Sequence, residues 1–284
     1  MDWSIYWFMF PLAICVTTTA SLCGIGGPAL FTPIMLIILP MIGPEYALTS
    51  AVAAFAAALL TQCFGFSSAF VGYYRRRLVD FRSALPFATI GVPLGIIGAL
   101  IANLADDLLL KGVYGVLMLG LAAVMLRKSD AAPAIPAGEE TQLVDSDGQT
   151  YRYRKPRQGL GAAITGFGAL LTGMVSVGIG EVLMPQLIKR HRLPVPVAAG
   201  TSVFVSILVV LASAATLVTG LILAGGVAAF PWNLVCYTVP GVLIGGQIGP
   251  RLQGRIDQAV LVYFIGGLFF TIGLAMLWIV YRAH

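Results

Sequence analysis

Two copies of one glycine-rich stretch contain residues that could bind an anion. The copies read Gly24-Ile25-Gly26-Gly27-Pro28 and Gly178-Ile179-Gly180-Glu181. The first N–H groups of a helix are free to bind a negative group, which glycine allows to approach the backbone closely. The alternative role is close helix packing, for which membrane proteins also use small residues. Because the break is repeated, we predict that five glycines bind substrate: Gly24, Gly26, Gly27, Gly178 and Gly180.

A proline and a pair of hydroxyl residues follow each break at a matched spacing. Pro33 precedes Thr49-Ser50 by 16 residues, and Pro185 precedes Thr201-Ser202 by the same interval. We expect both pairs one to two turns inside the following long helix, where a hydroxyl can donate to an anion or bond back to a carbonyl. Since the spacing recurs, we predict that Thr49, Ser50, Thr201 and Ser202 bind substrate. Three prolines are assigned to helix breaking: Pro28, Pro33 and Pro185.

Glu181 is the carboxylate that falls inside an apolar run. A charge at the bilayer centre costs at least about 2.5 kcal/mol, so it suggests a function. Glu181 could couple transport to protons, accept hydrogen bonds from freed backbone N–H groups, or pair with Arg190 or Arg192. It could also only cap the half-helix that starts at residue 182. Three further polar residues are expected to support the site or bridge helices: Gln62, Gln186 and Gln247.

The composition places these residues in a membrane. Of the 284 residues, 58% are hydrophobic and 10% are charged, whereas soluble domains have roughly 25% charged residues. The four cysteines form no CxxC pair and there are two histidines, so the roughly four clustered ligands of a zinc site are missing. We therefore predict an all-α polytopic membrane protein surrounded by lipid. We expect no metal, no cofactor and no nucleic-acid partner, and the sequence predicts no particular oligomeric state.

The apolar runs fall into two sets of five. The runs are 5–23, 28–42, 47–73, 83–104 and 108–127, then 159–177, 179–188, 196–222, 232–250 and 258–281. The second run of each set has 15 or 10 residues, short of the roughly 20 that span a bilayer. We predict that each half is a broken, re-entrant helical hairpin followed by three transmembrane helices; ten full crossings are the alternative. The halves are a first repeat at 1–127 and a second at 158–284.

The distribution of basic residues predicts an orientation. Of the 17 Lys and Arg residues, all but Lys111 and Arg282 fall in the loop near Arg75, in or beside the linker 128–157, and in two later turns. The positive-inside rule places these loops in the cytoplasm and both termini outside. With three full crossings in each half, the second half is inverted relative to the first. Inverted halves with broken helices are typical of secondary transporters.

The linker 128–157 is the long polar stretch of the chain. An Asp147-Gly148 turn between alternating residues predicts a small β-hairpin over 143–153. We interpret the linker as a cytoplasmic connector whose basic ends serve topology; a regulatory segment is the alternative.

Taken together, these motifs resemble the sulfite/organosulfonate exporter family TauE/SafE. The resemblance rests on the glycine-rich break, the proline about seven residues beyond it, and the later Ala-x-Thr-Ser, all present twice. It covers essentially the whole chain outside 128–157. The first copy departs from the usual triple glycine at Pro28, and the second is two residues shorter and has Glu181 in place of a glycine.

The resemblance implies a bacterial inner-membrane exporter of a small sulfur-containing anion, such as sulfite, sulfoacetate, sulfolactate or isethionate. We expect the anion to bind between the two breaks and to cross by alternating access. An anion channel and a carrier of the same fold for another small anion, such as a carboxylate, are the alternatives. An enzyme is not expected, because the chain has one buried carboxylate where acid–base chemistry usually needs two groups.

The predicted orientation can be tested with reporter fusions. Alkaline phosphatase, which is active only outside the cytoplasm, should be active when fused after Arg282 and inactive when inserted within the linker 128–157. Green fluorescent protein, which folds in the cytoplasm, should give the opposite pattern. Phosphatase activity from the linker fusion alone would contradict the orientation.

Overall fold

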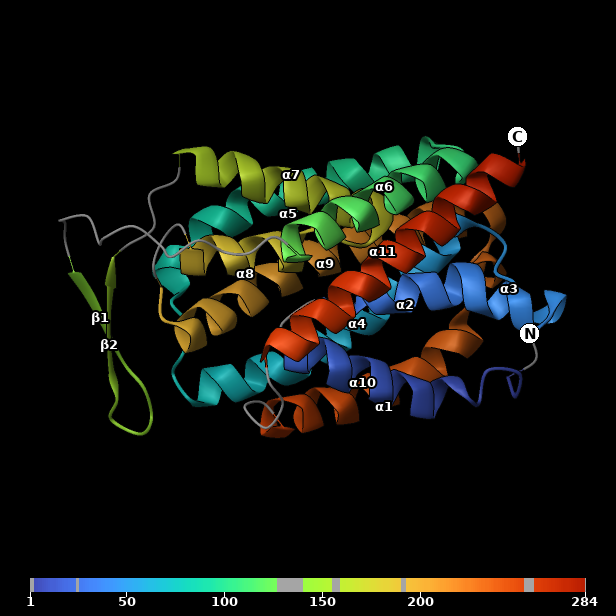
Figure 1. The fold of residues 1–284 in the computed structure, drawn as a ribbon. Helices are drawn as coiled ribbons and strands as arrows, with labels where there is room; N and C mark the ends of the chain where they lie inside the picture. The colour runs from blue at the N-terminus through green and yellow to red at the C-terminus, as the bar shows by residue number, and fades with distance from the viewer. Residues whose placement is uncertain are drawn as a thin grey trace.

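The computed structural model describes residues 3–23, 26–126, 140–154, 159–189, 193–252 and 258–283. These residues form a bundle of roughly aligned helices with one β-hairpin at an end (Figure 1). The helices of the first half are α1 (Met9–Cys23), α2 (Pro28–Pro33), α3 (Leu39–Ile42), α4 (Ala51–Arg75), α5 (Phe81–Leu104) and α6 (Asp107–Leu126). The second half contains α7 (Gly159–Val175), α8 (Ile179–Lys189), α9 (Val195–Gly225), α10 (Trp232–Leu252) and α11 (Gln258–Ala283). Short helical turns are a π-helix at Ile34–Ile38 and 3₁₀ turns at Pro44–Tyr46 and Val227–Ala229.

The predicted all-helical class is confirmed. Among the described residues, five helices are long and apolar enough to cross a membrane: α4, α5, α6, α9 and the part of α11 from Tyr263 to Ala283. The predicted short runs are short here too, since residues 28–42 and α8 are apolar helical stretches below spanning length. Pro33 interrupts the regular α-helix within residues 28–42, because it has no N–H to donate, and the helix widens into a π-turn directly after it.

The start of α4 differs from the expectation. Thr49 and Ser50 precede the helix rather than lying one to two turns inside it. Ser50 is the N-cap, with its hydroxyl accepting from Ala53 N at 3.1 Å. The Asp107 carboxylate accepts from Ala51 N at 2.9 and 3.0 Å. Two acceptors therefore satisfy the free N–H groups at this point, which favours a helix that begins at Ala51.

The two halves pack against each other through glycine-lined contacts. Helix α1 lies along α10, α5 along α7, and α6 along α11, while α4 and α9 contact each other. A Cβ added at Gly241 would lie 2.7 Å from the carbonyl oxygen of Phe10, and one at Gly173 would fall against that of Gly95. Larger side chains at these positions would separate the helices, as at other close contacts in membranes.

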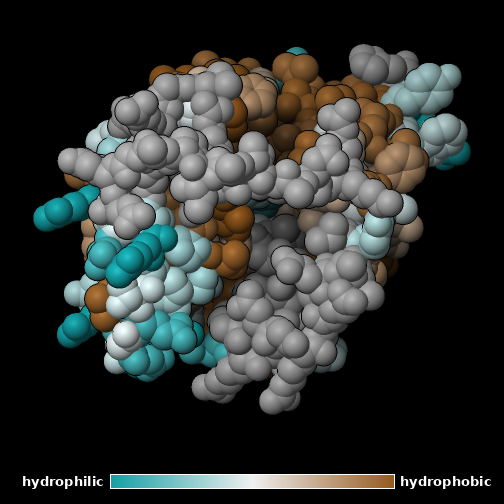
Figure 2. Space-filling view, turned by 60° about the vertical axis from the view of Figure 1, so that its left-hand side comes forward, coloured by the Kyte–Doolittle hydropathy of each residue, from teal (hydrophilic) through white to brown (hydrophobic). Residues whose placement is uncertain are grey.

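The ends of the bundle differ in character. The start of α1 and the end of α11 lie together at one end, and the β-hairpin lies at the other (Figure 1). Figure 2, turned toward the hairpin end, shows hydrophilic residues gathered at the lower left and hydrophobic residues over the upper part. Exposed apolar side chains include Leu100 on α5, Val124 on α6 and Phe264 on α11. An outer surface of this kind suits contact with lipid rather than water.

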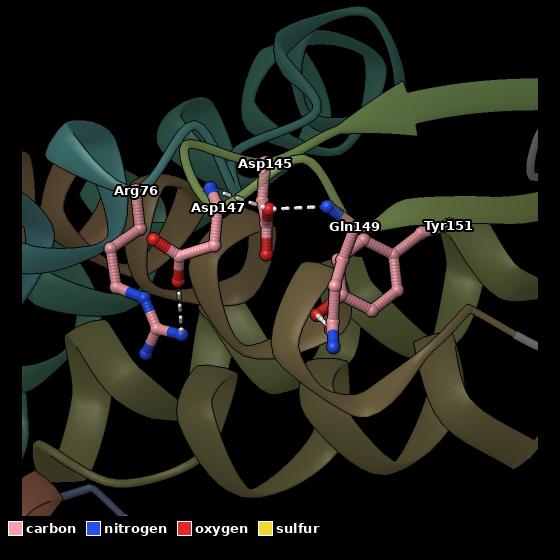
Figure 3. A network of polar contacts seen from close by, with 5 residues as sticks. All are labelled: Arg76, Asp145, Asp147, Gln149 and Tyr151. Carbon is pink, nitrogen blue, oxygen red and sulfur yellow. Dashed lines mark hydrogen bonds and ion pairs between the residues drawn. The ribbon is translucent and has the colours of Figure 1, made fainter.

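The predicted hairpin of the linker is confirmed. Strand β1 (Glu140–Val144) pairs antiparallel with β2 (Thr150–Arg154), with Leu143 opposite Tyr151. In the turn, Asp145 Oδ1 accepts from Asp147 N at 2.8 Å and Gln149 N at 2.9 Å (Figure 3). The Asp145 carboxylate thus accepts from two N–H groups of the turn that are not paired with a strand.

The hairpin is attached to the turn between α4 and α5. Ser146 N donates to Arg76 O at 3.2 Å, and the exposed ion pair of Arg76 with Asp147 at 3.8 Å adds little. The stronger contact is buried, where the Tyr153 hydroxyl donates to Asp80 Oδ2 at 2.9 Å. Burial, together with the neighbouring Asp80 carboxylate, raises the pKa of Tyr153. The β-hairpin at residues 140–154 is therefore packed on the bundle.

Glycine substitutions test the close helix contact. Gly173→Ala should destabilise the protein by about 1–3 kcal/mol, because the added methyl meets the backbone of α5 and the helices must separate. The matched control is Gly112→Ala on α6, where nothing lies within 4 Å of the added Cβ. The melting temperature in detergent should fall for the first variant only. Equal melting temperatures would show that α5 and α7 are not in close contact.

Candidate functional site

Both predicted breaks interrupt helices and reverse the chain. Helix α1 ends at Cys23 and α2 starts at Pro28; helix α7 ends at Val175 and α8 starts at Ile179. In Figure 1 the helix after each break runs back toward the end from which the chain came. In the second break, Gly178 has φ +151° and an added Cβ would meet the carbonyl of Gly168, so only glycine suits this position. Gly24 lies outside the described residues.

The carboxylate of Glu181 joins the two breaks. Its Oε1 accepts from Gly26 N at 3.0 Å, and its Oε2 accepts from Gly178 N, also at 3.0 Å. Gly180 lies beside the same point, since its added Cβ would be 3.6 Å from the Cα of Gly26. Hydrogen bonds from amides to a charged acceptor are stronger than those between neutral groups. One side chain thus connects backbone groups from the two halves.

This geometry supports two of the roles that the sequence left open for Glu181, capping of α8 and orientation of a backbone amide. The bond to Gly178 N, three residues back, is the reach of a capping-box glutamate, and the bond to Gly26 N orients a freed backbone amide. Both roles therefore have a geometric basis. Arg190 and Arg192 lie outside the described residues, and proton coupling stays a prediction.

Hydroxyl groups that the sequence did not single out add two more contacts. Thr32 of α2 and Ser176 of the second break share a hydrogen bond of 2.7 Å in a buried position. Thr172 Oγ1 accepts from Ile179 N at 2.7 Å and supports the start of α8. None of the three stands in a repeated pair, which is why the spacing argument missed them. Ser176 has φ +65°, an unusual backbone angle for serine that could not be read from the sequence.

The start of α2 is surrounded by side chains of α4 and α6. Gln62 of α4 is 4% exposed, and its Oε1 lies against Gly27, with no hydrogen-bond partner among the described residues. Tyr114 of α6 is fully buried, and its hydroxyl donates to Ala29 O at 3.2 Å. Pro28 is the first residue of α2, where its missing N–H costs no hydrogen bond.

One residue of each Thr-Ser pair serves a helix start in this structure. Ser50 caps α4, and Thr49 next to it is exposed. The second pair lies inside α9, as expected: Thr201 Oγ1 accepts from Asp80 N at 3.1 Å, and Ser202 is buried about two turns from the start of the helix. The contacts of Ser50 and Thr201 thus lie on the α4 start and the α4–α5 turn, whereas Gly26, Gly178 and Glu181 are brought together. Substrate binding by the pairs stays a prediction.

Two glutamines bridge neighbouring helices. Gln186 of α8 donates to Gly161 O at 2.9 Å and accepts from Thr165 at 3.3 Å, both in α7. Gln247 of α10 donates to Ser68 Oγ of α4 at 2.7 Å. Pro185 lies inside α8 next to Gln186. These contacts hold the second hairpin and the α4–α10 pair in place.

Three of the cavities between the described helices have known linings, and Glu181 lines none of these three. The first, of about 640 Å³, lies among α4, α9 and α10; the second, of about 790 Å³, among α6, α7 and α11; and the third, of about 370 Å³, between α5 and α9. Their linings are largely apolar, with Leu60, Phe64 and Val235 in the first and Val113, Val116 and Phe167 in the second. The first two cavities offer few polar groups to an anion, and the third is lined by Asn103, Thr216 and Thr219 without a backbone amide freed by a helix break.

Comparisons with known proteins identify relatives of this chain. The family model described as "Sulfite exporter TauE/SafE" matches residues 9–276. A "Probable membrane transporter protein YunE" of Bacillus subtilis (strain 168) is 24% identical over 269 residues, which are 94% of this chain and 95% of the relative. A "Probable membrane transporter protein" of Xylella fastidiosa (strain 9a5c) is 27% identical over 242 residues, covering 84% and 81% of the two chains. No solved structure matches.

The bond between the two hairpins can be tested with a double-mutant cycle. Thr32→Val and Ser176→Ala each remove one hydroxyl of the buried pair, and each should destabilise the protein. The double variant should lose less than the sum, by about 0.5–1.5 kcal/mol, because one hydrogen bond is removed only once. Unfolding in detergent with increasing denaturant measures the four stabilities. Additive losses would show that the two hydroxyls do not interact.

Proposed function

Because the chain belongs to the TauE/SafE sulfite exporter family, we propose that it exports a small sulfur-containing anion by alternating access. It is a multi-pass membrane transporter, not an enzyme. Sulfite and organosulfonates such as sulfoacetate, sulfolactate and isethionate are the proposed substrates. They are small, and each carries an oxyanion that backbone amides can bind.

The observation that carries this proposal is the convergence of two break amides on one point. The N–H groups of Gly26 and Gly178 come from different halves of the chain and lie on the two oxygens of a single carboxylate. A place where donors from both halves meet is suited to alternating access, since relative motion of the halves changes its exposure. We therefore propose that the substrate oxyanion binds there.

The pattern of helix packing supports two equivalent, inverted halves. If α1, α2, α4, α5 and α6 correspond in order to α7, α8, α9, α10 and α11, the contact of α1 with α10 matches that of α7 with α5. The contacts of α4 with α9 and of α6 with α11 map onto themselves. A twofold relation between the halves would produce this set of pairs. An odd number of crossings in each half would make that relation an inversion.

We further propose that this protein lies in the bacterial inner membrane with the linker in the cytoplasm and both termini outside. The membrane potential then favours export, since one charge across 100 mV is worth about 2.3 kcal/mol. A monoanion could leave the cell by uniport without protons, and a dianion would gain twice as much.

A carboxylate is the second candidate substrate. The amides of Gly26 and Gly178 hold the planar carboxylate of Glu181 at 3.0 Å on each side. The donor spacing therefore suits two oxygens of one carboxylate as well as two of one sulfonate. The family favours the sulfur anions, and transport measured with both classes of anion separates them.

Reconstitution in liposomes tests the function. The purified full chain should show saturable counterflow of sulfite or a sulfonate, and the same anions should raise its melting temperature. Sulfate and acetate serve as comparison anions, and liposomes without protein measure leak. Stabilisation and counterflow with acetate alone would replace the sulfur anions with carboxylates, and unitary currents in a planar bilayer would indicate a channel.

Removing the charge of Glu181 tests uniport. Glu181→Gln should retain outward transport of a sulfonate, because the membrane potential alone can drive an anion out. The measurement is efflux of labelled isethionate from proteoliposomes with an imposed potential and equal pH on both sides. Complete loss of efflux from a variant with the wild-type melting profile would show that the carboxylate is obligatory for transport.

A further inference from the structure

The two break amides are already engaged by a group of the protein itself. Glu181 uses one oxygen for Gly26 N and the other for Gly178 N. An N–H group makes one good hydrogen bond at a time, so a substrate oxyanion that needs these donors must take them from Glu181. The negative charge of Glu181 adds to the competition, because two like charges at one site repel each other.

Among the described residues, no cation that would let the two anions coexist lies within ion-pair distance of Glu181. Its own helix α8 carries one cation, Lys189, at its last residue, about two turns beyond Glu181. Helices α7 and α9, which α8 contacts, and helix α2 contain no ionisable side chain. Tyr114 of α6 is occupied by its bond to Ala29 O. Within the part of the chain that the structure describes, Glu181 has no ion-pair partner. Displacement, rather than joint binding, follows from this charge arrangement.

A second, independent feature beside the amides indicates a ligand. Gln62 Oε1 is buried and without a hydrogen-bond partner among the described residues, and it lies against Gly27, the neighbour of Gly26. A buried acceptor without a donor is unfavourable, and such groups in native proteins usually have a role. A ligand with an O–H group near its oxyanion could donate to this oxygen.

We propose that Glu181 is an internal competitor for the substrate, displaced when the substrate oxyanion binds the amides of Gly26 and Gly178, and that Gln62 accepts from a hydroxyl of that substrate. This inference rests on the proposed function, whose anion site it uses. Among the proposed substrates, a hydroxyl acceptor favours the two hydroxylated organosulfonates, isethionate and sulfolactate. Isethionate is the smaller of the two and is used as the probe. Ethanesulfonate has the same oxyanion without the hydroxyl and is the matched probe.

Competition by Glu181 reduces the apparent affinity for the substrate. The apparent affinity equals the intrinsic affinity multiplied by the fraction of molecules in which the two amides are free. Glu181→Gln removes the charge and leaves an amide whose single oxygen can accept from only one break. We therefore expect Glu181→Gln to bind both sulfonates about tenfold more tightly than the wild type, or more. The control is Glu45→Gln, which neutralises an exposed carboxylate in the turn before α4 and should bind as the wild type does.

The experiment is calorimetric titration of the purified full chain in detergent with isethionate and with ethanesulfonate. An affinity of folded Glu181→Gln that equals or falls below that of the wild type would overturn the competition. Glu181→Asp is the second variant, because it keeps the charge but is one methylene too short to reach both breaks. It should bind both probes more tightly than the wild type, which keeps the test decisive if Glu181→Gln does not fold.

The role of Gln62 is tested by the ratio of the two affinities. The wild type should prefer isethionate over ethanesulfonate, and Gln62→Leu should bind the two equally, because the acceptor of the hydroxyl is gone. A preference for isethionate that persists in Gln62→Leu would overturn the proposal that Gln62 accepts from the substrate hydroxyl. Loss of binding of both probes to the same degree would also overturn it, since that result indicates a general packing role.

The outcomes separate this inference from the proposed function. Counterflow of isethionate without tighter binding by Glu181→Gln overturns the competition and leaves the exporter standing. Tight binding of acetate, but of no sulfonate, by Glu181→Gln supports the competition and overturns the sulfur-anion substrate. Absence of binding and transport of every anion tested, in the wild type and both Glu181 variants, overturns both.

Discussion

The structure depends on one carboxylate that joins two interrupted helices. Freed backbone amides are unfavourable in an apolar interior unless they have partners, and each break frees several. Glu181 satisfies one amide of each break with bonds of 3.0 Å. A glutamate that would be unfavourable alone in a membrane thus becomes favourable, because the groups it meets need an acceptor. The same contact joins the two broken hairpins directly.

Helix packing brings the breaks close enough for this contact. Glycines allow α5 and α7, and α1 and α10, to approach until backbone meets backbone. These two helix pairs connect the halves. The first helix of each broken hairpin therefore packs against a long helix of the opposite half. The buried hydrogen bond between Thr32 and Ser176 then links the hairpins to each other at a second point. The result is a polar centre enclosed by helices whose outer faces are apolar.

The β-hairpin and the helix starts form a second polar region, at the hairpin end of the bundle. Asp80 caps α5, with its carboxylate accepting from Arg82 N at 3.1 Å, and receives the Tyr153 hydroxyl from the hairpin. Its own N–H donates to Thr201 of α9. The turn between α4 and α5 therefore connects both halves and the β-hairpin. Movement of one half against the other would have to act on this turn as well as on the breaks.

Hydropathy, glycine and proline are local properties, so the sequence by itself determined the helices, the two breaks, the short second run of each half and the linker hairpin. It also identified Glu181 as out of place in an apolar run. The tertiary structure alone decided the partners: Gly26 and Glu181 are 155 residues apart, and Thr32 and Ser176 are 144 apart. The start of α4 was decided in the same way, because the Asp107 carboxylate that accepts from Ala51 N is 56 residues away. A side chain's partner depends on which helices pack together, and no local pattern contains that information.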